Sequence, residues 1–280
     1  MENDEWVTGS VTLKIKGQPV EMQMTVPAKP VKPQRMLPIF HKMTNAFVDQ
    51  SVETVEAEGK TISCKAGCGS CCRQPVPISE MEVYQIAELV ASMPEPRRSQ
   101  IKQSFAEGAE HFRSIGWFDD AKERADLTPS EPHETAVKNL VEMAMRYFYE
   151  GVPCPFLENE ACSIHEVRPT ACREYLVTSP AENCARPTAE TVRVIDIYLK
   201  PSLALRRISD SGRLRSLGFL PLIRALEIAE MFPEDFTERT GREWMGDFFD
   251  DITARDQAGS AAKISPEPGA TRRRKRRTRR

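Results

Sequence analysis

The cysteines of this chain are confined to two segments, and that arrangement constrains the fold more than any other feature. Four of the eight lie within residues 64–72, and the other four lie within residues 154–184. They are Cys64, Cys68, Cys71 and Cys72, followed by Cys154, Cys162, Cys172 and Cys184. Thiolates are soft ligands that select zinc, copper(I) or iron–sulfur clusters over hard cations. The pattern predicts that the two segments fold together around a metal centre, with all eight cysteines as ligands.

The rest of the chain indicates the cellular compartment in which those thiols are expected. Its 280 residues suffice for a hydrophobic core in one domain or two unequal ones, so disulfides are not needed for folding. No apolar run approaches the roughly 20 residues of a membrane span, and the acidic N-terminus lacks signal-peptide features. We therefore expect a cytoplasmic protein, in which clustered cysteines stay reduced and bind metal.

Positive charge is concentrated at the C-terminus. The chain has 39 Lys and Arg against 41 Asp and Glu, but eight of the cations fall in residues 272–280, so the remainder carries 31 against 41. The composition of residues 257–280 predicts a disordered basic tail. Such a tail could contact a polyanion by counterion release, or fold back on the acidic body. The sequence specifies no other protein or small-molecule partner.

Hydrophobic periodicity predicts a mainly α-helical fold with a small β component. Alternation over 9–26 predicts an N-terminal β-hairpin, which forms a unit of residues 1–35 with the proline-containing linker after it. Residues 36–256 are expected to form the cysteine-cluster domain, with helices around the two cysteine-rich loops. The expected helices are 38–58, 79–92, 97–115, one starting at 128–131 and ending at Gly151, 202–208, 218–232 and one within 234–253.

Other local predictions concern strands, caps and buried faces. Residues 158–160 are expected to close a small hairpin, 191–199 to form a strand, and 116–130 to be polar and irregular. Ser79 and Glu82 form a capping box at the start of the helix that follows the first cysteine loop. The predicted buried faces comprise Ile101, Phe105, Phe112 and Ile115 in one helix and Val137, Leu140, Val141, Ala144, Met145 and Phe148 in another.

The cysteine spacing favours an iron–sulfur cluster over zinc. Structural zinc usually uses paired C-x2-C knuckles, and Cys68–Cys71 is such a pair, whereas the downstream cysteines are widely and irregularly spaced. Such spacing suits a bulky cluster held by several loops. Gly67 and Gly69 leave room for close wrapping of the loop. In extended backbone, adjacent Cys71 and Cys72 would point to opposite sides, toward two sites or leaving one thiol free.

These motifs resemble the CxxxCxxCC (YkgJ-like) cysteine-cluster family of zinc- or iron-chelating proteins. The resemblance covers about residues 60–190 and rests on Cys64-x3-Cys68-x2-Cys71-Cys72, Cys154-Pro-Phe-Leu, Cys162-x-Ile164-His165, Arg168-Pro169 and Cys172-Arg173. The chain departs from the family at His165, where Tyr is frequent. One branch of the family resembles a flagellin lysine methylase that carries an iron–sulfur cluster, which implies methyl transfer as one activity.

Two functional hypotheses remain open from the sequence. The first is a redox or methyl-transfer enzyme with an iron–sulfur cluster, in which Arg168 and Arg173 bind a cofactor by donating to cluster sulfur or to an anionic ligand. The second is a non-catalytic, zinc-stabilised interaction module, in which the two arginines form structural ion pairs. An enzyme needs an open coordination site or a pocket beside the metal, whereas a structural site is closed.

Overall fold

The computed structural model describes residues 5–15, 18–127, 132–188 and 190–262, and within them helices dominate. The α-helices are α1 (Leu37–Ala57), α2 (Glu80–Ser92), α3 (Arg97–Ser114), α4 (Trp117–Leu127), α5 (His133–Tyr149), α6 (Thr170–Arg173), α7 (Pro201–Ile208), α8 (Ala225–Met231) and α9 (Gly241–Ala262). The short 3-10 helices include η1 (Pro33–Met36), η2 (Ser70–Arg73), η4 (His165–Val167), η5 (Ala181–Ala185) and η7 (Leu222–Arg224). The predicted mainly α-helical class is confirmed. None of the helices in these ranges combines the length and hydropathy needed to cross a bilayer.

The strands form three separate antiparallel pairs. The N-terminal hairpin joins β1 (Trp6–Ile15) to β2 (Gln18–Pro27), as the alternating sequence predicts. A second pair joins β3 (Pro30–Val31) to β6 (Arg239–Thr240), and the third joins β4 (Leu157–Glu158) to β5 (Ala161–Cys162). The second pair corrects the expectation that residues 27–35 are only an extended linker, because β3 and η1 both lie within them.

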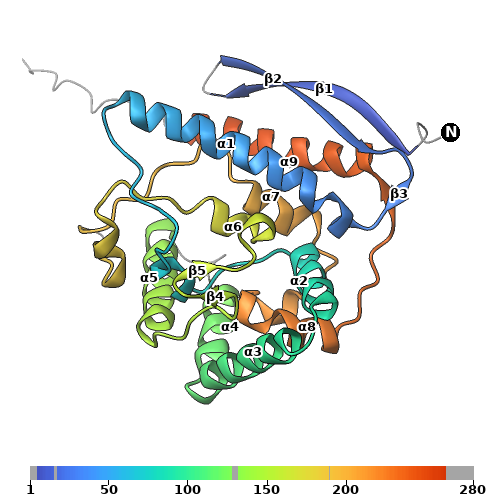
Figure 1. Cartoon of the computed structure of the whole chain (residues 1–280). Coiled ribbons are helices and arrows are strands. Elements are labelled where there is room, and N and C mark those ends of the chain that lie inside the picture. The colour runs from blue at the N-terminus through green and yellow to red at the C-terminus, as the bar shows by residue number, and fades with distance from the viewer. Residues whose placement is uncertain (1–4, 16–17, 128–131, 189, 263–280) are drawn as a thin grey trace, which may run out of the picture.

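Two groups of helices enclose the cysteine segments (Figure 1). In one group, the hairpin, α1, α7 and α9 share a core that includes Phe40, Leu205 and Phe248. In the other, α2, α3 and α8 pack around Ile86 and Phe105, beside α4 and α5. The short helix α6, which carries Cys172, contacts both α1 and α7. Cys154 and Cys162 pack against the second core, so both cores position the cysteine segments.

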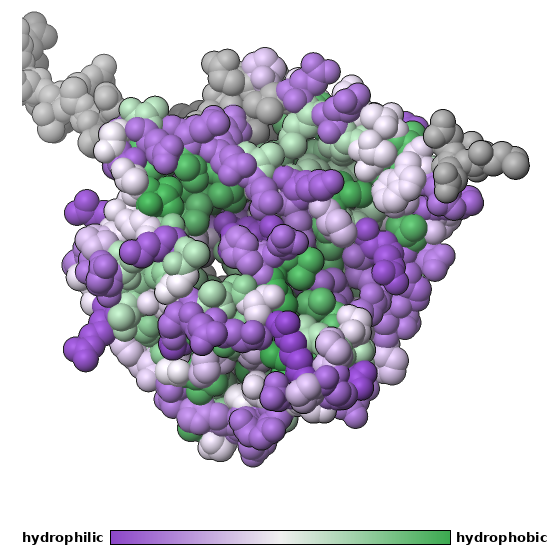
Figure 2. Space-filling view, viewed as in Figure 1, coloured by the Kyte–Doolittle hydropathy of each residue, from purple (hydrophilic) through white to green (hydrophobic). Residues whose placement is uncertain are grey.

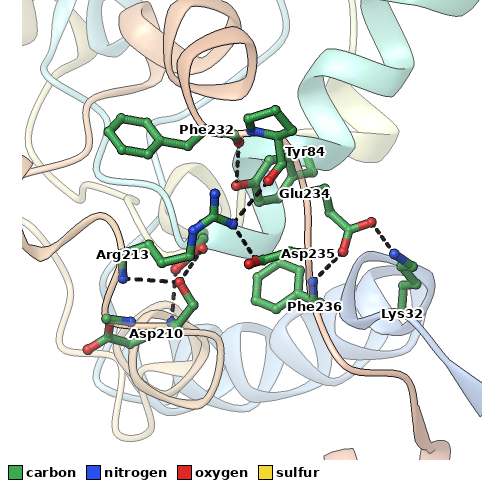
Figure 3. Close-up of polar contacts among 12 residues, drawn as sticks. Lys32, Tyr84, Asp210, Arg213, Phe232, Glu234, Asp235 and Phe236 are labelled. Atoms are coloured by element: carbon green, nitrogen blue, oxygen red, sulfur yellow. Dashed lines mark hydrogen bonds and ion pairs between the residues drawn. The ribbon is translucent and has the colours of Figure 1, made fainter.

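Polar contacts fasten the chain between α8 and α9 to the rest of the fold (Figure 3). The Tyr84 hydroxyl of α2 donates to the carbonyl of Phe232 at 2.8 Å. The Lys32 ammonium donates to the Glu234 carboxylate at 2.5 Å. Because α2 belongs to one helix group and Lys32 precedes the other, these contacts hold the two groups together.

Helix α4 corrects the expectation that residues 116–130 are polar and irregular. Most of its residues are charged, so no broad apolar stripe marks it in the sequence. It is nevertheless fixed by Trp117, which is fully buried and donates its indole N–H to the carbonyl of Met143 at 3.1 Å. A single large aromatic residue thus anchors a helix that periodicity does not reveal.

The buried face of α5 also differs from the prediction. Val137, Leu140 and Val141, which the sequence predicts to be buried, are exposed. The buried residues are Ala136, Met143 and Tyr147, together with Phe148, which is buried as predicted. Tyr147 stacks on Phe112 of α3, with ring centroids 3.7 Å apart. Helix α5 has apolar residues on two sides, and packing against the unpredicted α4 decides which side is buried. The expected capping start at 128–131 lies outside the described residues.

Four smaller corrections concern the C-terminal half and the end of α3. Residues 191–199 form no strand beyond an isolated bridge between Val177 and Val194, although Ile195 and Ile197 are buried against α1. Only residues 222–231 of the expected helix 218–232 are helical. Helix α9 continues to Ala262, past the predicted start of the tail at Gln257. Ile115, predicted to point inward, is 40% exposed.

Candidate metal centre

The first cysteine segment is a tight loop between α1 and α2. Its turns are closed by backbone hydrogen bonds from Cys68 N–H to Lys65 O at 3.2 Å and from Cys72 N–H to Gly69 O at 2.9 Å. Gly67 has a φ of 81°, a left-handed conformation that favours glycine. The loop ends at the predicted capping box, where Ser79 donates its backbone N–H to the Glu82 carboxylate at 2.7 Å. Local sequence signals therefore fix both the turns and the exit of this loop.

The second cysteine segment packs directly on the first. The backbone N–H of Cys154 donates to the carbonyl of Cys72 at 2.7 Å. A Cβ added at Gly69 would lie 2.5 Å from Glu160 Oε2 and 2.7 Å from Leu157 Cδ1, so the β4–β5 hairpin approaches closer than any side chain at position 69 would allow. The predicted meeting of the two cysteine segments is thus observed, and Gly69 makes room for the hairpin.

An ion pair that the sequence analysis missed joins the same two segments. The Arg73 guanidinium donates to both carboxylate oxygens of Glu160, at 3.0 and 2.8 Å, and also to the carbonyl of Gly69 at 3.1 Å. Glu160 lies at the turn of the hairpin with a φ of 57°. The only sequence signal for this pair is its position, since Arg73 follows Cys72 and Glu160 precedes Cys162 by two residues.

The eight thiols are all free, and the electrostatic interactions among seven of them fall into two groups that share Cys71. In the first group, Cys64 and Cys184 interact with each other and with Cys68. In the second group, Cys172 interacts with Cys154 and Cys162. Cys71 interacts with members of both groups. Cysteines of both segments therefore lie in one part of the molecule, and Cys72 is the neighbour of Cys71 in η2.

The geometry at Cys71 and Cys72 differs from the expectation for extended backbone. Both residues lie in the 3-10 helix η2, where adjacent side chains do not alternate between opposite sides. The neighbouring Cys72 thiol, together with burial, raises the pKa of Cys71. The alternation expected for an extended backbone therefore does not apply to these two side chains.

Burial disfavours the thiolate forms of Cys154 and Cys172, so a cation must compensate their charge when they bind metal. Burial raises the pKa of Cys154 to about 12, and burial followed by the neighbouring thiols raises the pKa of Cys172 well above its ordinary value. The Arg168 guanidinium acts in the opposite direction, lowering the pKa of Cys162 and Cys172. Since the thiolate is the metal ligand, binding here must release protons and must supply charge compensation.

The donor set fits a soft metal. Within the ranges that the structure describes, no group of three or more His, Cys, Asp or Glu side chains is arranged to hold a single metal ion. The residue types nevertheless match the preference of zinc and iron for thiolate, and the two segments that carry the free cysteines adjoin through the Cys154–Cys72 backbone hydrogen bond. His165 is exposed beside this region, and burial and then Arg168 and Arg173 lower its pKa.

The fold and this site define a helical protein with a cysteine-based metal-chelating domain. Residues 63–189 match the model of the CxxCxxCC family, described as "Putative zinc- or iron-chelating domain". The matched segment contains all eight cysteines, Arg168 and Arg173, and it confirms the family resemblance over these residues. No curated protein and no solved structure matches the chain significantly.

Proposed function

We propose that the chain holds an iron–sulfur cluster through the thiolates of its two cysteine segments. The observation that carries this proposal is the origin of the thiols: Cys71 of η2 interacts electrostatically with thiols from β5, α6 and η5. Ligands from several separate elements suit a bulky cluster better than a pair of zinc knuckles. We further propose a cytoplasmic location, where such thiols remain reduced.

A redox or methyl-transfer role is the second part of the proposal. A catalytic centre needs space for a reactant, and a cavity of about 510 Å³ lies beside the cysteine segments, lined in part by Arg168 and Arg173. A bound cluster would supply electron transfer or Lewis acidity next to this space, while the chain's own residues would bind and orient the reactant. A zinc-stabilised interaction module has no need of such a cavity.

Metal analysis of anaerobically purified full-length protein tests the first part of the proposal. We expect iron, acid-labile sulfide and a brown protein with visible absorption. The control is the same chain with Cys71 and Cys172 both changed to Ser, which should be colourless. Colourless wild-type protein with stoichiometric zinc would overturn the iron–sulfur assignment and favour the interaction module.

A further inference from the structure

The cavity beside the cysteine segments has one charged and one apolar side. It lies between α1 and the chain from η4 to α6, with a volume of about 510 Å³. Helix α1 contributes Val48 and Val52, and Leu176 adds to the apolar part. Arg168 and Arg173 line the same space. The volume is in the range of small-molecule sites, and the combination of an apolar wall with convergent cations is characteristic of them.

Arg173 is a buried cation whose hydrogen-bond acceptors are all neutral. Its side chain is only 4% exposed. Nη1 donates to Asn45 Oδ1 at 3.0 Å, Nε donates to the carbonyl of Arg168 at 3.2 Å, and Nη2 donates to the carbonyl of Glu166. These bonds fix the guanidinium in position without an ion pair, although the Glu82 carboxylate interacts with its charge, and a buried charge without a paired counter-ion is costly.

Arg168 lies close enough to Arg173 for their charges to interact, which, after burial, lowers the pKa of Arg173. The Nε of Arg168 is buried and has no hydrogen-bond partner. Neither arginine forms an ion pair with any carboxylate in the described part of the chain, although eighteen other ion pairs are present there. Two guanidiniums thus line the cavity without an ion-paired carboxylate.

We propose that this cavity binds a small organic anion, whose carboxylate or phosphate group lies between Arg168 and Arg173 and whose apolar part lies on Val48, Val52 and Leu176. A guanidinium presents a planar fork of N–H donors that matches both anionic groups. Asp49 and Glu166 also line the cavity without pairing with either arginine, so they limit the total charge that the ligand can carry. The cavity is the one proposed above for the reactant, so this inference rests on that proposal and names the chemical class of the reactant, while anion binding itself requires neither iron nor zinc.

A single isosteric substitution tests the site without disturbing the fold. Asn45→Asp keeps the shape of the side chain and the acceptor for Arg173 Nη1, but it places a permanent negative charge against the guanidinium. The matched control is Gln50→Glu, which adds the same charge to α1 outside the cavity lining. Binding is measured by calorimetry on the full-length protein as purified, with hexanoate, butyl phosphate and inorganic phosphate as probes, and metal content is determined on the same samples.

We expect at least one organic anion to bind wild type and Gln50→Glu equally, and to bind Asn45→Asp roughly tenfold or more weakly, because the charge-assisted contact to Arg173 is lost. The stronger of hexanoate and butyl phosphate identifies the anionic group, and both should bind more tightly than inorganic phosphate. Equal binding to Asn45→Asp and Gln50→Glu, or no binding of any probe to wild type, would overturn the proposal. If the purified wild type contains no metal but still binds the anion more tightly than Asn45→Asp does, the anion site is supported and the proposed metal centre is refuted.

Discussion

Glu82 and Thr170 are 88 residues apart in the sequence, and the Glu82 carboxylate accepts a hydrogen bond from the backbone N–H of Thr170 at 2.7 Å. The other carboxylate oxygen accepts from the backbone N–H and the hydroxyl of Ser79, each at 2.7 Å. Glu82 is 2% exposed. Glu82, which caps α2 after the first cysteine segment, therefore also holds the start of α6. Helix α6 carries Cys172 of the second cysteine segment.

Glu82→Gln should destabilise the fold and weaken metal retention. Three donors face the carboxylate, and an amide would place its own N–H₂ group against at least one of them. Losing a buried, charge-assisted hydrogen bond costs about 1.5–3 kcal/mol. Chemical denaturation and metal analysis measure the two effects, with Glu53→Gln on the exposed side of α1 as the neutral control. Equal stability of the two variants would show that this carboxylate does not join the segments.

Cys71→Ser should lose more metal than Cys64→Ser. Cys71 lies between the two thiol groups, whereas Cys64 is exposed at the edge of one of them. Metal content per chain and melting temperature, determined on protein purified in parallel, measure the difference. Cys64→Ser matching or exceeding the loss in Cys71→Ser would place the centre of coordination elsewhere.

Cys68→Ser and Cys172→Ser should also lose metal and stability, and the structure adds Cys184→Ser to this class. The sequence alone suggests a smaller effect for Cys184, because it lies in a polar stretch beyond the main motifs. In the structure it is 7% exposed, and its thiol interacts with Cys68 and Cys64. The same two measurements decide the matter, and full metal occupancy in Cys68→Ser would remove the first loop from the coordination shell.

Gly69→Ala should displace the β4–β5 hairpin. The added Cβ would lie 2.5 Å from Glu160 Oε2 and 3.1 Å from the Glu160 Cα, and backbone cannot move away as easily as a side chain. Overpacking of this kind costs about 1–3 kcal/mol. Gly246→Ala is the control, since its Cβ meets nothing within 4 Å and its helix should gain stability. Thermal unfolding of both variants measures this, and a stable Gly69→Ala with normal metal content would contradict the close approach.

His41 should make the fold less stable in acid. Burial, and then the charges of Arg173 and Arg168, lower its pKa from 6.5 to about 3. Between these values the unfolded chain binds a proton that the folded chain does not. The contribution of His41 to the free energy of unfolding is therefore fully present above pH 6.5 and is lost as the pH falls toward 3. The slope from this residue is at most about 1.4 kcal/mol per pH unit.

His41→Gln should remove that contribution. Urea unfolding at several pH values between 4 and 8 gives the free energy of unfolding of wild type and His41→Gln as a function of pH. The two curves should converge at low pH, because only the wild type loses the contribution of His41. Because acid protonates the thiols equally in both proteins, the difference between the curves isolates His41. Parallel curves would show that the imidazole titrates normally in the folded state.

Removing residues 263–280 should abolish polyanion binding and leave the melting temperature nearly unchanged. Their composition is too poor in apolar residues to bury a hydrophobic face, and they contain the eight cations of 272–280. Heparin retention at rising salt compares the truncated and full-length chains. A large fall in melting temperature would mean instead that this segment docks on the acidic body.

The sequence determined those features whose cause is local. The Ser79–Glu82 capping box, the N-terminal hairpin and the β4–β5 hairpin each depend on a few neighbouring residues, and each is found where the sequence predicts it. The two cysteine segments also identify a metal-chelating domain without reference to any fold, because eight reduced thiols in two clusters have few other uses.

Tertiary packing decided the features that depend on distant partners. Helix α4 is anchored by Trp117, and α5 buries one of two apolar sides because α4 lies against it. Residues 191–199 bury Ile195 and Ile197 but have no partner strand to extend their single bridge. The same holds at the site, where Arg73 meets Glu160 and Arg173 is held by neutral acceptors, including Asn45 from α1. Spacing along a chain reports which residues share a face, but whether a charge finds a counter-charge depends on which segments the folded chain brings together.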